Sequence, residues 1–268
     1  MKTITIVFKE LLRRYKDHQL ELTGSSLAYF FLLALFPFLI FLNALLSFFG
    51  FAIQDILISI APLLPNSTFE ILELYLESIS AYDNTVLLSF GILGTIFPAS
   101  IAVTALMKAI FRAYNQKNHR SWLATQGLFV LFTLLIGISL ILSLLLPMLG
   151  QGFLDFIGQY FIVPNTLSVF WHFFRWIVAT LFMMGTLAAI YKVVPYTPYK
   201  QSIWPGTIFA VVSWFSISIL VSFYFNQFAN LSFVYGSIGA VIALMIWLYF
   251  TGIIIILGAE LNDIIDHL

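Results

Sequence analysis

Three long stretches of the chain carry no charged side chain, and they limit what the chain can fold into. They are residues 22–54, 121–154 and 201–259. The apolar run at residues 235–259 is long enough to cross a bilayer, which takes about 20 apolar residues in a helix. Only 9% of all residues are charged, against about 25% in an average soluble domain. We therefore expect a polytopic membrane protein.

Apolar runs bounded by charged residues, proline or glycine predict six transmembrane helices. The expected spans are residues 24–50, 85–108, 122–147, 168–191, 204–226 and 234–258. The first run is too long for the apolar part of a secretory signal peptide, so we expect it to be retained. The predicted fold is a single all-α membrane domain over residues 1–268 that ends in a short tail at residues 259–268.

The basic residues gather on one side of this arrangement. Every Lys and Arg except Arg175 falls in the N-terminal segment, in the connection after the second span or in the connection after the fourth. Lys and Arg are enriched in the cytoplasmic segments of membrane proteins. Both termini are therefore predicted to be cytoplasmic, in the cell membrane of a bacterium.

Two segments outside the spans have the periodicity of amphipathic helices. In residues 1–22, an apolar face lies opposite Lys9, Arg13 and Lys16. We expect this helix to lie on the anionic inner leaflet, with membrane lipids as its partners. The outer loop, residues 51–84, is expected to hold a second short helix with an apolar stripe of Phe69, Leu72, Leu76 and Ile79.

Four sequence stretches together resemble the YihY/BrkB family of bacterial inner-membrane proteins. They are SLAYFFLLALFPFLIF (26–41), FPASIAVTALMKAIFRAYN (97–115), VVPYTPYKQSIWPGTIFA (193–210) and SFVYGSIGAVIALMIWLYFTGIIIILGAELN (232–262). The resemblance implies a six-helix fold and a cytoplasmic-membrane location. It also implies a link with virulence through serum resistance, with export or with envelope lipid traffic. The family was once labelled a ribonuclease.

A metal-dependent ribonuclease needs clustered histidines and carboxylates to hold metal and activate water. The four histidines, His18, His119, His172 and His267, stand apart in the sequence, and the chain has no cysteine. The basic segments near the inner leaflet more often serve topology and lipid headgroups than RNA. We therefore expect no enzyme, no metal, no cofactor and no nucleic-acid partner.

The second span carries a polar stripe. Ser100, Thr104, Lys108 and Arg112 recur every four residues, which places them on one helical face. Lys108 and Arg112 could bind the headgroup of an anionic or lipid-linked solute in a cavity open to the cytoplasm. Alternatively, both side chains reach to the inner interface only as topology anchors.

Glu260 follows the last apolar run, near the C-terminal end of a helix, where the helix dipole disfavours an anion. A base should therefore compensate its charge, and we expect Lys108, Arg112 or Lys192 to do so. The pair would be a structural latch between spans, or an inner gate or proton-coupled group. The structural latch is the commoner role of ion pairs.

Polar residues also recur in the outer halves of three other spans. Such small and hydroxyl residues usually mean close helix packing, and they could equally line a cavity open to the outside. Arg175, the lone outer base, either contacts an anion or reaches to the interface. The stripe residues are Asn43, Ser47, Ser139, Ser143, Ser218, Ser222 and Asn226.

The sequence thus leaves two functions open. One is a transporter or exporter of an amphiphilic or anionic envelope-related solute or lipid. The other is a non-transporting membrane scaffold for envelope machinery. A transporter needs polar side chains in a pocket at membrane depth, whereas a scaffold should pack without one.

Overall fold

A computed structural model describes residues 2–48, 53–79, 84–116, 120–158, 165–195, 203–227 and 237–267. The described residues form helices and no strand. Six helices among them are long and apolar enough to cross a membrane. They are α2 (Leu20–Phe48), α5 (Asn84–Ala113), α6 (Trp122–Gly158), α7 (Asn165–Val193), α8 (Trp204–Gln227) and α10 (Ser237–Asp266). The predicted all-α six-span fold is confirmed.

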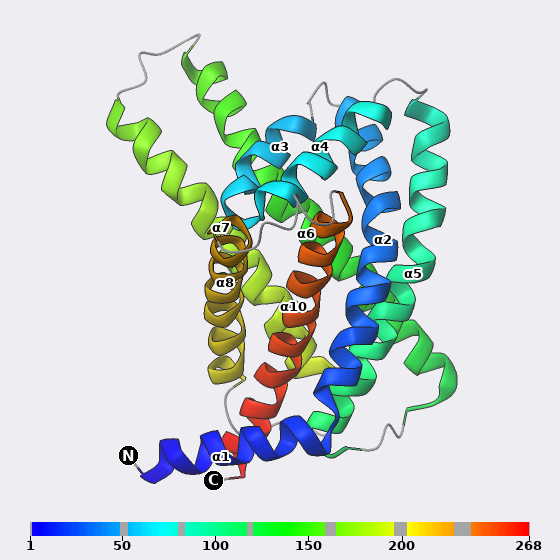
Figure 1. Cartoon of the computed structure of the whole chain (residues 1–268), viewed down its shortest axis with the longest axis vertical. Coiled ribbons are helices and arrows are strands. Elements are labelled where there is room, and N and C mark those ends of the chain that lie inside the picture. Colours follow the sequence, from blue (N-terminus) through cyan, green and yellow to red (C-terminus); the bar gives the residue numbers. More distant parts are fainter. Residues whose placement is uncertain are drawn as a thin grey trace.

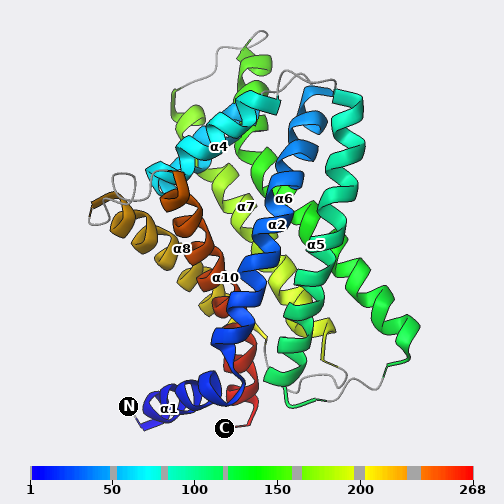
Figure 2. The ribbon, with the colours of Figure 1, turned by 45° about the vertical axis from the view of Figure 1, so that its right-hand side comes forward.

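Both chain termini lie at one end of the bundle, which we call the terminal end; the opposite end is the far end (Figure 1). Helix α1 (Lys2–Asp17) runs across the terminal end, roughly perpendicular to the spans (Figures 1 and 2). Phe8 and Leu12 are exposed on α1, as are Lys9, Arg13 and Lys16. This placement suits a helix that lies in the plane of a membrane surface.

The far end holds the short helices between α2 and α5 (Figure 1). They are α3 (Ile53–Ile60), the 3₁₀ turn η1 (Ala61–Leu63) and α4 (Asn66–Ile79). The predicted apolar stripe of α4 faces the bundle, because Leu72 and Leu76 are buried whereas Glu70 and Glu77 are exposed. The sequence predicted one helix in this loop, and the structure adds α3 and η1.

The tail differs from the prediction, because α10 continues to Asp266 instead of ending near residue 258. The helix persists because the polar residues after Gly258 are buried against other helices rather than released into water. Glu260, Asn262 and Asp263 are each at most 2% exposed. The end of the last span is therefore part of the packed interior.

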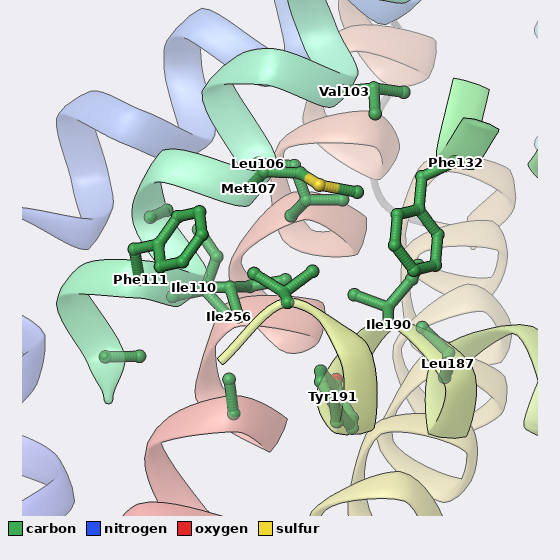
Figure 3. Packing of buried hydrophobic residues seen from close by; sticks show 14 of the residues in the cluster. Val103, Leu106, Met107, Ile110, Phe111, Phe132, Leu187, Ile190, Tyr191 and Ile256 are labelled. Atoms are coloured by element: carbon green, nitrogen blue, oxygen red, sulfur yellow. The ribbon is translucent and has the colours of Figure 1, made fainter. Parts of the chain in front are cut away.

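The main hydrophobic core fills the half of the bundle toward the terminal end. It joins α5, α6, α7 and α10, with Met107, Phe132 and Tyr191 among its fully buried large side chains (Figure 3). Nearby, α8 and α10 approach so closely that a Cβ atom at Gly206 would lie 2.0 Å from the carbonyl oxygen of Gly258. The terminal end of the bundle is thus tightly packed.

Candidate functional site

Two acidic side chains are buried where α10 reaches the terminal end. Glu260 is 0% exposed and Asp263 is 1% exposed. Arg14 of α1 reaches both of them, since its Nη1 donates to Glu260 Oε2 at 3.1 Å and to Asp263 Oδ2 at 2.6 Å. A buried charge is costly unless it is paired and hydrogen-bonded, and Arg14 supplies both.

Arg14 also joins α1 to α5. Its Nη1 donates to the carbonyl oxygen of Ala113, the last residue of α5, at 3.2 Å. Its Nε donates to Glu10 Oε1, one turn earlier in α1, at 3.1 Å. Burial lowers the pKa of Arg14, but the hydrogen bonds to Asp263, Glu10 and Glu260 raise it by more, so this guanidinium stays charged.

His18 is the second partner of Glu260. Its Nδ1 lies 2.5 Å from Glu260 Oε1. The chain turns from α1 into α2 at Gln19, whose φ of 52° is left-handed, a conformation uncommon for a residue with a side chain. This turn holds His18 beneath the end of α10. We call Glu10, Arg14, His18, Glu260 and Asp263 the terminal network.

Asn262 extends the polar contacts to α8. Its Oδ1 accepts a hydrogen bond from the backbone N–H of Gly206 at 2.7 Å, which satisfies a donor in the first turn of α8. Burial raises the pKa of Tyr114, directly after α5, and the nearby Asn262 side chain offsets part of this rise. The GAELND segment, residues 258–263, thus contacts α1, α5 and α8.

The structure differs from the pairing expected for Glu260. The described ion pairs of Glu260 are with Arg14 and His18, and none is with Lys108, Arg112 or Lys192. Lys108 and Lys192 are exposed, while Arg112 donates to Thr23 Oγ1 of α2 at 3.2 Å. Lys108, Arg112 and Lys192 are thus exposed on their spans, whereas Arg14 reaches Glu260 from α1.

The polar stripe of α5 is only partly enclosed. Ser100 and Thr104 are half-buried, and Lys108 and Arg112 are exposed at the terminal end. Arg112 contacts α2 rather than a second member of the stripe. The described residues place the stripe beside α2 and its basic end in the open, so the proposed anion site there stays a prediction.

The stripe of α8 is used in contacts between helices. Ser222 donates to the carbonyl oxygen of Leu64 at 3.0 Å, and Asn226 Oδ1 accepts from the N–H of Asn66 at 2.9 Å. Ser218 Oγ accepts a hydrogen bond from Trp247 Nε1 of α10 at 2.9 Å. The α8 stripe therefore fastens the η1–α4 segment and α10, which favours the packing interpretation.

The remaining outer positions are only partly described. Asn43 and Ser139 are buried within the bundle. Ser47, Ser143 and Arg175 lie on described helices, but their side chains fall outside the described part of the structure. Their roles stay predictions.

An apolar groove of about 460 Å³ lies between α6 and α7. It opens outward, and its lining is apolar apart from one threonine: Leu135, Val178, Leu181, Phe182, Gly185, Thr186 and Ala189. Lys192 is exposed three residues after Ala189, on the same face of α7 and closer to the terminal end. The groove is thus almost entirely apolar, and the exposed base Lys192 follows its last α7 residue by about one helical turn.

The described residues contain no group of three or more His, Asp and Glu side chains placed to hold a metal ion. Two histidines that stand alone in the sequence do have acidic partners. His18 contacts Glu260, and His267 Nδ1 lies 3.5 Å from Asp263 Oδ1. His119 lies outside the described residues, as does the side chain of His172.

Sequence reasoning missed Arg14, His18 and Asp263. A signal was present, because Glu10, Arg14 and His18 recur every four residues beside the apolar face of the N-terminal segment. Charged residues that border the apolar face of an interfacial helix can reach the spans that pack on that helix. Sequence spacing alone does not say which span ends above it.

Comparison with known proteins places the chain in a family. A family model described as virulence factor BrkB matches residues 11–267. The ribonuclease-like protein YfkH of Bacillus subtilis (strain 168) is 37% identical over 262 residues, which cover 96% of this chain and 94% of that protein. A UPF0761 membrane protein of Psychromonas ingrahamii is 26% identical over 288 residues, which cover 100% of this chain and 91% of that protein.

A further UPF0761 membrane protein, from Tolumonas auensis, is 26% identical and covers 92% of this chain and 81% of its own length. No solved structure matches the chain. The family model and these relatives extend over nearly all of the chain, and the family model includes the six spans and, from Arg14 to Asp263, all of the terminal network except Glu10. The chain belongs to the virulence factor BrkB family and is a multi-pass bacterial membrane protein.

Proposed function

We propose that the protein is a transporter or exporter of an amphiphilic, anionic solute of the cell envelope, and specifically of an anionic lipid. The observation that carries the proposal is the open apolar groove between α6 and α7, whose last α7 residue, Ala189, is followed one turn later by the exposed base Lys192. The groove would take an acyl chain and Lys192 the anionic headgroup. We propose no enzymatic activity for the protein. The ribonuclease-like name describes the relative YfkH and not this chain.

The position of the groove supports an occupant from the membrane. Its α7 residues, from Val178 to Ala189, lie in the half of helix α7 that leads to the terminal end. Gly185 in the middle leaves open space, because a Cβ atom there would meet nothing within 4 Å. A lipid of the leaflet at the terminal end could therefore enter sideways, without crossing a barrier of packed side chains.

A matched pair of glycine substitutions tests the proposal. A Cβ atom at Gly137 of α6 would likewise meet nothing within 4 Å, but Gly137 lies on the opposite face of α6 from Leu135. Gly185→Trp should fill the groove, while Gly137→Trp adds the same bulk elsewhere. Proteoliposomes containing tail-labelled phosphatidylglycerol would report lipid movement between leaflets through quenching of the outer label.

We expect wild type and Gly137→Trp to move the label at similar rates and Gly185→Trp to lose most of this movement. Lys192→Gln should slow phosphatidylglycerol more than phosphatidylcholine, because only the former carries a net negative charge. Equal rates for the two tryptophan variants would contradict a role for the groove. Wild-type vesicles that behave like protein-free vesicles would contradict lipid transport.

The scaffold remains the second candidate, and one observation favours it. The hydrogen bonds of Ser218, Ser222 and Asn226 join α8 to α10, to Leu64 after η1 and to the start of α4, which suits a rigid body. A non-transporting scaffold should move no lipid even as wild type, and Gly185→Trp should leave the cellular phenotype unchanged. In a transporter, Gly185→Trp should reduce both lipid movement and the cellular phenotype.

A further inference from the structure

The buried part of the terminal network is one positive charge short when His18 is neutral. Glu260 and Asp263 carry two buried negative charges, while Arg14 supplies one positive charge. Glu10 and Asp17 pair with Arg13 at the exposed edge, so the deficit falls on Glu260 and Asp263, at 0% and 1% exposure. An uncompensated buried carboxylate is costly, which favours binding of one proton.

The surroundings of Glu260 offer one place for that proton. Helix α1 contributes Glu10 and Arg14, Tyr114 directly after α5 contributes a neutral phenol, and α10 itself contributes Asp263. The described contact from α8 is uncharged, because it is the hydrogen bond from the Gly206 amide to Asn262. On α2, Glu21 is exposed to solvent.

Arg14 and His267 do not supply the missing positive charge. Arg14 donates to both carboxylates and to the carbonyl of Ala113. The side chain of His267 is 68% exposed, so water screens its charge. His18, at 21% exposure and in direct contact with Glu260, is the remaining titratable partner.

We propose that the His18–Glu260 pair is a proton-binding site and that its bound proton fastens α1 to α10. With the proton, the pair is a histidinium beside a carboxylate, and the charges of the buried part of the terminal network, from Arg14, His18, Glu260 and Asp263, sum to zero. Without it, one buried negative charge is left over and the contact between α1 and α10 weakens. The proposal holds whether or not the protein moves a solute.

The sign of the pH dependence follows from the proton count. The docked form binds one proton more than the undocked form, so docking is favoured at lower pH and weakened as pH rises. Histidine is the side chain that ordinarily changes charge within this range, between about pH 5 and 8. Linkage limits the fall in the docking constant to about tenfold per pH unit for one proton.

Spin labels can measure the docking, because the chain has no native cysteine. Lys9→Cys on α1 and Ala124→Cys on α6 are both exposed positions outside the terminal network. Labels there, in the full-length protein in lipid nanodiscs, should give one narrow distance distribution at about pH 6. At about pH 8.5 a second, broader population should appear.

Three variants separate the proposal from general effects of pH. Glu260→Gln removes the negative charge that the proton balances, so α1 should stay docked at both pH values. His18→Gln removes the proton acceptor, so the second population should be present at both. His267→Gln, which removes an exposed histidine at the same end, should respond to pH as wild type does.

A wild-type distance distribution that does not change with pH would overturn the proposal. So would a pH response that survives in both Glu260→Gln and His18→Gln, or one that disappears in His267→Gln. If Glu260→Gln does not yield folded protein, the His18→Gln and His267→Gln pair still decides the question.

Discussion

A single arginine holds together three segments that are far apart in the sequence. Arg14 contacts Glu260 and Asp263 in α10, the end of α5 at Ala113 and, locally, Glu10. Breaking a buried ion pair by removing one partner typically costs about 3–5 kcal/mol, because the other charge stays buried and unpaired. An exposed pair of the same type contributes at most about 1 kcal/mol.

The neighbouring arginine provides the control for this difference. Arg14→Ala should lower stability by about 3 kcal/mol or more, because two buried carboxylates lose their base. Arg13→Ala should cost less than about 1 kcal/mol, since Arg13 is 65% exposed beside Glu10. Unfolding in mixed detergent micelles, followed by helical circular dichroism, gives both values. Equal losses in the two variants would mean that the terminal network contributes no special stability.

The need for a partner at Glu260 could be predicted from the sequence, but the partner could not. A carboxylate near the C-terminal end of a helix is disfavoured by the helix dipole, and this argument is local. The choice between Lys108 and Arg14 depends on which helix crosses beneath α10, which is a property of the tertiary fold. The turn at Gln19 places α1, and therefore Arg14, beneath α10, and the periodicity of the sequence does not predict that turn.

At the scale of elements, the six spans were predictable because their signal is local. Length and apolarity suffice to identify them, and the observed helices begin and end within a few residues of most predicted boundaries. The exceptions are α6, which runs on to Gly158, and α10, which runs on to Asp266. For α10 the cause is burial of polar residues by other helices. The sequence of one span does not show which helices surround its end.

The contact between α8 and α10 depends on a missing side chain. A Cβ atom at Gly206 would lie 2.0 Å from the Gly258 carbonyl oxygen and 2.6 Å from the Asn262 side chain. Small residues let membrane helices approach closely, and dispersion then stabilises the pair. Neither helix can yield locally, because the nearest atoms include backbone.

Gly206→Ala should therefore push α8 away from α10 and lower stability by about 1–3 kcal/mol, the usual cost of overpacking. Gly127→Ala is the matched change, since a Cβ atom at Gly127 meets nothing within 4 Å. Alanine should even favour the α6 helix slightly there, because glycine is a poor helix former. Thermal aggregation temperatures of the purified variants would compare them. A Gly206→Ala protein as stable as Gly127→Ala would show that the two helices are not in this contact.

At the scale of the whole molecule, the two ends of the bundle differ in chemistry. The terminal end carries the termini, the terminal network and the exposed bases Lys108, Arg112 and Lys192. The far end carries α4 with the exposed acids Glu70 and Glu77. Because basic segments stay on the cytoplasmic side of membranes, this division predicts a cytoplasmic terminal end.

Cysteine labelling in intact cells tests this orientation without disturbing the bundle. Ser78 near the end of α4 and Lys16 on α1 are both exposed, and the chain has no native cysteine to interfere. A membrane-impermeant maleimide added outside the inner membrane should label Ser78→Cys and leave Lys16→Cys unlabelled. In inside-out vesicles the pattern should reverse, because Lys16 is predicted to face the cytoplasm. Labelling of Ser78→Cys only in inside-out vesicles would invert the orientation. The groove between α6 and α7 would then open toward the outer leaflet, and the lipid that Lys192 meets would come from the opposite side.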